Sequence, residues 1–74
     1  MGERRIHMTI HATERALRYG LDPHEIEKII REGERTPEGR RNARYVLRIK
    51  KSVYVAICAE SPEKIVVKTV TRGR

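Results

Sequence analysis

The sequence contains no tryptophan, no phenylalanine and no glutamine, and its only cysteine is Cys58. A single cysteine excludes a disulfide framework within the chain. No apolar run approaches the roughly 20 residues that a membrane-spanning helix needs. The basic residues near Met1 are not followed by the apolar stretch of a secretory signal. These absences predict a cytoplasmic protein that does not associate with membranes.

The positive charge of the chain is concentrated in one short segment. The 74 residues suffice for a single domain, with residues 6–71 as the folded core and residues 72–74 as a frayed tail. Seventeen Lys and Arg outnumber ten Asp and Glu, which gives a formal net charge of +7. Residues 35–51 hold seven of these cations and one acidic residue. Such a concentration is typical of a polyanion-binding surface, although a solvated basic loop has the same composition.

Two helices are predicted in the first half of the chain. Thr9 is a suitable cap for the first helix, which extends to about Tyr19 and ends at Gly20. Asp22 caps the second helix, and Glu25 three positions later completes a capping box. A glycine at position 33 ends this second helix. Its buried stripe comprises Ile26, Ile29 and Ile30.

The second half of the chain changes from helical spacing to alternation of apolar and polar residues. Residues 34–42 contain no large apolar side chain and are predicted to form a loop. Strands are expected over residues 44–50, 53–59 and 65–71, and residues 4–8 are a candidate fourth strand. The sequence therefore predicts an α+β fold, with two N-terminal helices packed on one face of a three- to four-stranded antiparallel sheet.

Alternation also assigns the strand residues to two faces. An antiparallel sheet can leave one face in water, so the cations are expected on an uncovered outer face. Val46, Val66 and Val70 point the same way, which indicates that this outer face is partly covered or meets a partner. The predicted inner positions are Tyr45, Leu47, Ile49, Val53, Val55, Ile57, Ile65 and Val67. The predicted outer positions are Arg44, Arg48, Lys50, Tyr54, Lys68 and Arg72.

One motif resembles that of a known family. The segment H-A-T-E-R at residues 11–15, followed by Gly20-Leu21 and the helix start at residues 23–26, resembles the H-A-x-x-R…G-(I/L) signature of a small domain-of-unknown-function family. That family is related to the RelE/ParE and BrnT toxins and to colicin D-type ribonuclease domains. The resemblance covers residues 6–71 and implies a RelE-like or colicin D-like fold. It also implies a toxin-like RNA-binding protein, possible metal-independent endoribonuclease activity on RNA or ribosome-associated RNA, and an antitoxin partner.

The candidate catalytic residues lie on the first predicted helix. Metal-free RNA cleavage needs an acid, a base and cations that stabilise the phosphate. His11 is the candidate acid or base, because histidine titrates near neutrality. Arg15 and Arg18 follow at i+4 and i+7 on the same helix face, where they can hold a phosphate. The alternative is an exposed histidine beside solvated arginines. The RelE-type C-terminal tyrosine is absent, since the last tyrosine is Tyr54.

The candidate RNA-binding residues are cations that would follow the phosphate backbone and a tyrosine that would stack on a base. No cofactor and no metal site are predicted, because soft ligands are few and dispersed, and Cys58 is interpreted as a buried small hydrophobe. Two alternatives remain: a non-catalytic nucleic-acid or ribosome-binding module, and a protein-interaction module. The protein is expected to be a monomer or a homodimer. The RNA-binding candidates are Arg40, Arg41, Arg44, Arg48, Lys50, Tyr54, Lys68 and Arg72.

Overall fold

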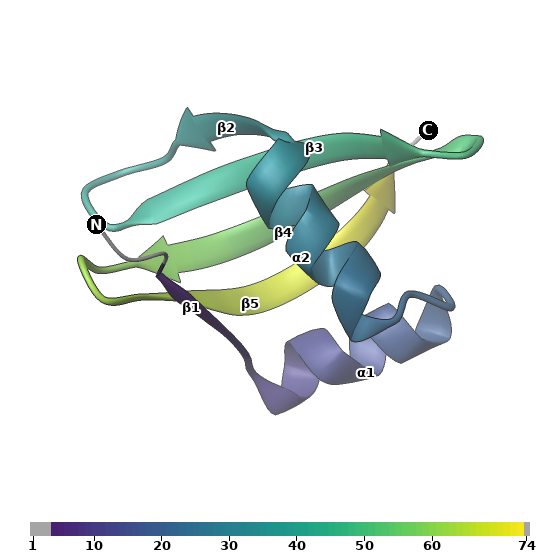
Figure 1. The fold of residues 1–74 in the computed structure, drawn as a ribbon, viewed down its shortest axis with the longest axis horizontal. Coiled ribbons are helices and arrows are strands. Elements are labelled where there is room, and N and C mark those ends of the chain that lie inside the picture. Colours follow the sequence, from purple (N-terminus) through teal and green to yellow (C-terminus); the bar gives the residue numbers. More distant parts are fainter. Residues whose placement is uncertain (1–3, 74) are drawn as a thin grey trace.

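A computed structural model describes residues 4–73, so residue 74 of the predicted tail lies outside the described residues. Within these residues, two helices and five strands follow one another, and the strands form one sheet in the order β1-β5-β4-β3-β2 (Figure 1). β1 runs parallel to β5, and all other neighbouring strands are antiparallel. The elements are β1 (Arg5–Met8), α1 (Ile10–Arg18), α2 (Pro23–Glu32), β2 (Glu34–Pro37), β3 (Asn42–Ile49), β4 (Ser52–Glu60) and β5 (Lys64–Gly73).

The prediction of a three- to four-stranded antiparallel sheet is wrong, because the sheet has five strands and is mixed, although the α+β class is retained. The two edge strands account for the difference. The segment predicted as a loop contains β2, which pairs with β3 through its backbone and needs no apolar side chains at an exposed edge. The parallel pairing of β1 with β5 brings Arg5 opposite Lys64, and no local pattern reveals a contact between such distant segments.

Both helices begin and end where their capping residues predict. The Thr9 hydroxyl accepts a hydrogen bond from the Ala12 amide at 3.0 Å, and Gly20, with φ of 73°, follows the end of α1. Asp22 and Glu25 form the reciprocal capping box, with N···O distances of 2.9 and 3.0 Å. In Figure 1, α1 lies against β5 and α2 against β3 and β4, all on one face of the sheet.

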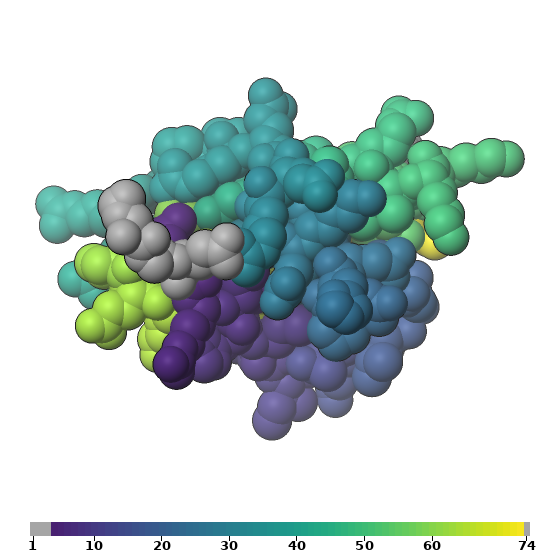
Figure 2. Space-filling view, in the orientation of Figure 1, coloured from purple at the N-terminus to yellow at the C-terminus, as the bar shows by residue number. Residues whose placement is uncertain are grey.

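A single hydrophobic cluster joins the helices to the sheet. No charged or polar side chain among residues 4–73 is fully buried in it. The space-filling view from the helix side shows the loop between β2 and β3 and the hairpin between β3 and β4 projecting at opposite ends (Figure 2). The basic segment that contains both turns therefore spans the length of the molecule. The largest fully buried side chains of the cluster are Ile26, Ile29, Val67, Val70 and Cys58.

The hairpin between β3 and β4 decides which side chains of β4 face the helices. Its two-residue turn pairs Ile49 with Ser52, so Tyr54 lies opposite Leu47 and shares its face. The prediction that the β-branched residues of β4 point inward is therefore wrong, because a continuous apolar run does not itself specify the face. The buried positions of β4 are Tyr54, Ala56 and Cys58, and Val53, Val55 and Ile57 lie on the opposite face.

An irregularity in the register of β4 and β5 changes the alternation of β5. It turns both Val67 and Val70 inward, although strict alternation would separate residues three apart. Arg72 pairs with Tyr54 and therefore faces the helices as well. The predictions that Val70, Tyr54 and Arg72 belong to the outer face are wrong. The inner-face predictions that the structure confirms are Tyr45, Leu47, Ile49, Ile65 and Val67.

Candidate functional site

The three catalytic candidates lie on the outer side of α1. His11 and Arg18 are exposed and Arg15 is half-buried, while the opposite side of α1 buries Ala12 and Ala16. Within residues 4–73, no hydrogen bond or ion pair involves the side chain of any of the three candidates. They also line none of the hollows of about 700, 450 and 80 Å³ in the described surface. The structure therefore does not bring His11 together with cations of the sheet at a concave site.

The structure divides the RNA-binding candidates among separate places. Tyr54 is only 7 % exposed, and its ring centroid lies 6.4 Å from that of Tyr19, so it cannot stack on a base. The Arg72 guanidinium carbon lies 5.6 Å from the Tyr19 ring centroid, on the helix side. Lys50 lies in the β3–β4 turn. The remaining candidates are Arg44, Arg48 and Lys68 on the open face of the sheet, opposite the helices, and Arg40 and Arg41 in the β2–β3 loop.

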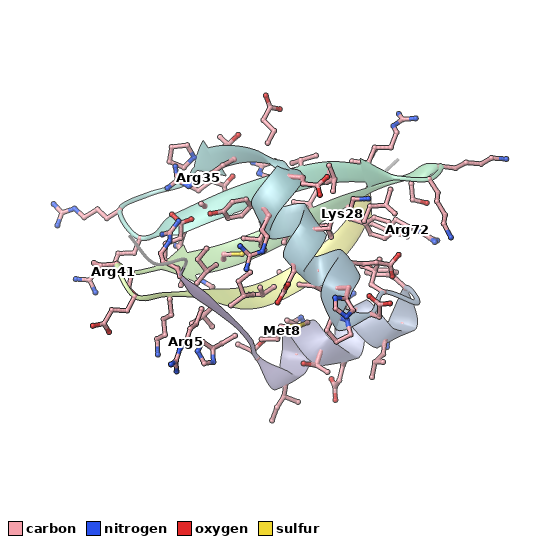
Figure 3. All side chains as sticks on the ribbon, in the orientation of Figure 1. Arg5, Met8, Lys28, Arg35, Arg41 and Arg72 are labelled. Atoms are coloured by element: carbon pink, nitrogen blue, oxygen red, sulfur yellow. The ribbon has the colours of Figure 1, made fainter. Side chains whose placement is uncertain are left out.

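Cations from three segments surround a hollow of about 700 Å³ at one end of the sheet. We call it the basic hollow and define it by Arg4 before β1, Arg40 and Arg41 in the β2–β3 loop, and Lys64 at the start of β5. The backbone amide of Glu60 donates a hydrogen bond to the Arg41 carbonyl at 2.6 Å, which holds the loop against the end of β4. Figure 3 shows Arg5, Arg35 and Arg41 at this end of the molecule, away from Arg72.

Glu60 is the acidic side chain that lines the basic hollow, and it is already engaged. Its side chain is 9 % exposed and accepts hydrogen bonds from the Arg35 Nε at 3.1 and 3.2 Å. The Tyr45 hydroxyl also donates to it, and the Arg4 Nη2 lies 3.8 Å away. The Arg35 hydrogen bond holds the pKa of Glu60 below its ordinary value. Burial, with the neighbouring carboxylate, raises the pKa of Tyr45. Glu60 is thus neutralised by its own partners.

Three cations of the basic hollow remain available to a ligand. Within residues 4–73, Arg40, Arg41 and Lys64 form no ion pair. Arginine offers a planar fork of donors that matches phosphate oxygens, and lysine supplies a flexible point charge. Together they can bind a phosphate group or another anion of similar size.

Two residues of the basic hollow, Arg4 and Lys64, were not among the sequence candidates. Both lie outside the segment of concentrated charge, so composition gave no reason to select them. The parallel pairing of β1 with β5 is what carries the start of β1 to the start of β5. A correct prediction of that pairing would have placed both cations beside the β4–β5 turn.

No group of three or more His, Cys, Asp or Glu side chains among residues 4–73 is placed to hold a metal ion. Neither α1 nor α2 is long and apolar enough to cross a bilayer.

Cys58 is expected to resist thiol reagents while the protein is folded. Its side chain is fully buried, and burial raises the pKa of the thiol to about 12, so the reactive thiolate is scarce. Alkylation by iodoacetamide at pH 8, followed by mass spectrometry, should be at least about 100-fold slower in native buffer than in denaturant. Equal rates in the two conditions would contradict the burial of Cys58.

Comparison with known proteins identifies one family. The family described as "Domain of unknown function (DUF4258)" matches residues 8–72, which includes both helices and β2 to β5 except the end of the last strand. No curated protein and no solved structure matches the chain. Because the match extends over most of the sequence, the chain belongs to the DUF4258 family of domains of unknown function.

Proposed function

We propose that the protein binds single-stranded RNA through the basic hollow and does not cleave it. The observation that carries this proposal is the convergence of four cations from three chain segments on one concavity of about 700 Å³. That volume lies within the range of roughly 300–1,000 Å³ that is common for ligand sites. Binding of a phosphate there needs no rearrangement of Glu60, whose charge is already balanced by Arg35.

The mixed charge on the exposed side of α2 supports a single strand over a DNA duplex. Reading a DNA duplex usually requires a basic helix that enters the major groove. The exposed side of α2 instead carries charges of both signs, including Glu27, Lys28 and Glu32. The choice of RNA over DNA rests on what the resemblance of residues 11–26 to a domain-of-unknown-function family implies, namely a relation to toxin and ribonuclease domains.

RNA cleavage is not proposed, because the side chains around the basic hollow are unsuited to acid–base catalysis. A general acid or base works best when its pKa lies near the working pH. Glu60, whose pKa is lowered, and the adjoining Tyr45, whose pKa is raised, both depart from that condition. The histidine selected for this role, His11, does not line the basic hollow.

Binding can be measured by the fluorescence anisotropy of a labelled RNA of about 20 nucleotides at several salt concentrations. Arg40→Glu with Arg41→Glu should weaken binding at least about 10-fold and lower the salt slope by about 1.4, since each phosphate contact on a single strand contributes about 0.7. The matched control is Arg15→Glu with Arg18→Glu on α1, which changes the net charge equally and should leave most of the affinity. Equal losses in the two double variants would refute the basic hollow as the RNA site.

The same RNA also tests the absence of cleavage. After prolonged incubation with the purified protein, a denaturing gel should show intact RNA. Cleavage that disappears in His11→Ala would instead establish a ribonuclease centred on α1, and the proposal of binding alone would fail.

A further inference from the structure

An apolar stripe runs along β4 on the open face of the sheet. Val53, Val55, Ile57 and Ala59 occupy alternate positions there, and each is partly exposed. Val46 of β3 lies opposite Val55 and widens the stripe. Both helices lie on the other face, so no described helix covers these side chains. A continuous row of aliphatic side chains along a central strand is unusual for a face that stays in water.

Cations border this stripe on both sides. Arg44 and Arg48 lie on β3, paired with Ile57 and Val53 respectively, and Lys68 lies on β5 with its Nζ 3.5 Å from the Asn42 Oδ1. Arg44 is hydrogen-bonded to Glu38, whereas Arg48 forms no ion pair with any residue in the range 4–73. Glu34 of β2 lies opposite Val46 on the same face and adds an acidic side chain. The open face therefore combines an apolar centre with a border on which Arg48 and Lys68 are cations without an ion pair among residues 4–73.

We propose that the open face docks an acidic amphipathic helix of a partner protein. Apolar side chains of such a helix would cover the β4 stripe. Its Asp and Glu side chains would form ion pairs with Arg48, Lys68 and Arg44. Alternate residues of a strand lie about 6.6 Å apart, so four of them span roughly 20 Å. At 1.5 Å per residue, a helix of about 13 residues matches that length.

Charge and side-chain type favour this occupant over two others. A second copy of the chain would place Arg48 and Lys68 of the two open faces close to each other, and the chain already carries a net charge of +7. RNA phosphates need cations rather than aliphatic side chains, and the cations that converge on one concavity lie at the basic hollow. The open face instead offers an apolar stripe that phosphates do not need.

The test uses a synthetic amphipathic peptide of about 18 residues, with leucines at helical spacing and glutamates elsewhere, and a second peptide in which lysines replace the glutamates. Fluorescence anisotropy and amide chemical shifts of the labelled full chain report affinity and location. We expect saturable binding of the acidic peptide, with shifts concentrated in β3, β4 and β5 on the open face. Equal affinity for the lysine peptide, or no saturable binding of the acidic peptide by about 1 mM, would overturn the proposal.

Substitutions then locate the site. Val55→Asp should weaken acidic-peptide binding at least about 10-fold, and Arg48→Glu, which leaves the apolar stripe intact, should weaken it several-fold. The matched control is Leu17→Asp, because Leu17 is 71 % exposed on α1 and should not contribute. If circular dichroism shows that the Val55→Asp variant does not fold, the test relies on the Arg48→Glu variant.

Two further outcomes would overturn the proposal. Loss of peptide binding in Leu17→Asp equal to that in Arg48→Glu would remove the open face as the site. If RNA displaces the peptide from a protein variant that carries Arg40→Glu and Arg41→Glu, the open face would be assigned to RNA instead. Neither result is expected, since the basic hollow and the β4 stripe consist of different side chains, apart from Ala59 at their junction.

Discussion

Replacement of Gly33 by alanine is expected to lower the free energy of unfolding by about 3 kcal/mol. Gly33 connects α2 to β2, and its amide donates a hydrogen bond to the Ile29 carbonyl. A Cβ atom built there would lie 2.4 Å from the Ile29 oxygen and 2.8 Å from the Val46 oxygen. Both are backbone atoms, so relief requires the end of α2 to move away from β3. A domain of 74 residues has a total stability of roughly 4–11 kcal/mol, which makes this loss severe.

Gly39→Ala is the matched control for this substitution. Gly39 has a φ of +83°, but a Cβ there would meet no atom within 4 Å. Its cost should therefore be the conformational one alone, about 1 kcal/mol. Urea unfolding followed by circular dichroism compares the two variants under the same conditions. A Gly33→Ala variant no less stable than Gly39→Ala would contradict the close approach of α2 to β3.

The helices could be predicted because their signals are local. Thr9, Asp22 and Glu25 cap through hydrogen bonds to residues three positions away, so the sequence alone contains the whole motif. Gly20 ends α1 through its positive φ, which is a local cause, whereas Gly33 is extended and its Cβ position is closed by the Ile29 carbonyl and by Val46 of β3. No assumption about the rest of the fold is needed for the start of either helix.

The sheet was harder to predict because its determinants lie in distant pairings. β2 is held by backbone hydrogen bonds to β3 and has no apolar pattern of its own. The run of apolar residues in β4 fits either face, and only the two-residue turn before Ser52 fixes its orientation. The register irregularity that turns Val70 inward has no clear signal in the alternating residues of β5.

The same strand pairings explain why the predicted RNA-binding residues lie on different faces of the sheet. The sequence placed Tyr54 and Arg72 on one surface with Arg44 and Arg48, and the register of β4 moves the first two to the helix side. What remains on the open face is more aliphatic than predicted. The concavity lined by cations lies instead at the end of the sheet, where Arg41 was a predicted RNA-binding residue and Lys64 was not. Two surfaces of different chemistry thus replace the single basic face.

Substitution of Glu60 by glutamine should make the free energy of unfolding less dependent on pH in the acidic range. Glu60 accepts hydrogen bonds from Arg35 and Tyr45, and the Arg35 bond is the largest cause of its lowered pKa. At pH 7, Glu60→Gln should lower the free energy of unfolding by about 2 kcal/mol, the scale of hydrogen bonds to a charged group. The exposed Glu63→Gln in the β4–β5 turn is the matched control and should change it by no more than about 0.5 kcal/mol.

The sign of the pH dependence follows from the direction of that pKa shift. The ordinary carboxyl pKa of 4.5 describes Glu60 in the unfolded chain, and the folded state binds the proton only at lower pH. The stabilisation by ionised Glu60 is therefore complete above the unfolded pKa and is lost as the pH falls through the folded one. Urea unfolding between about pH 7 and pH 3 should show the curves of wild type and Glu60→Gln converging below about pH 4.5. A constant separation over that range would mean that the Glu60 charge contributes nothing to the folded state, and that Arg35 and Tyr45 do not hold it as the structure describes.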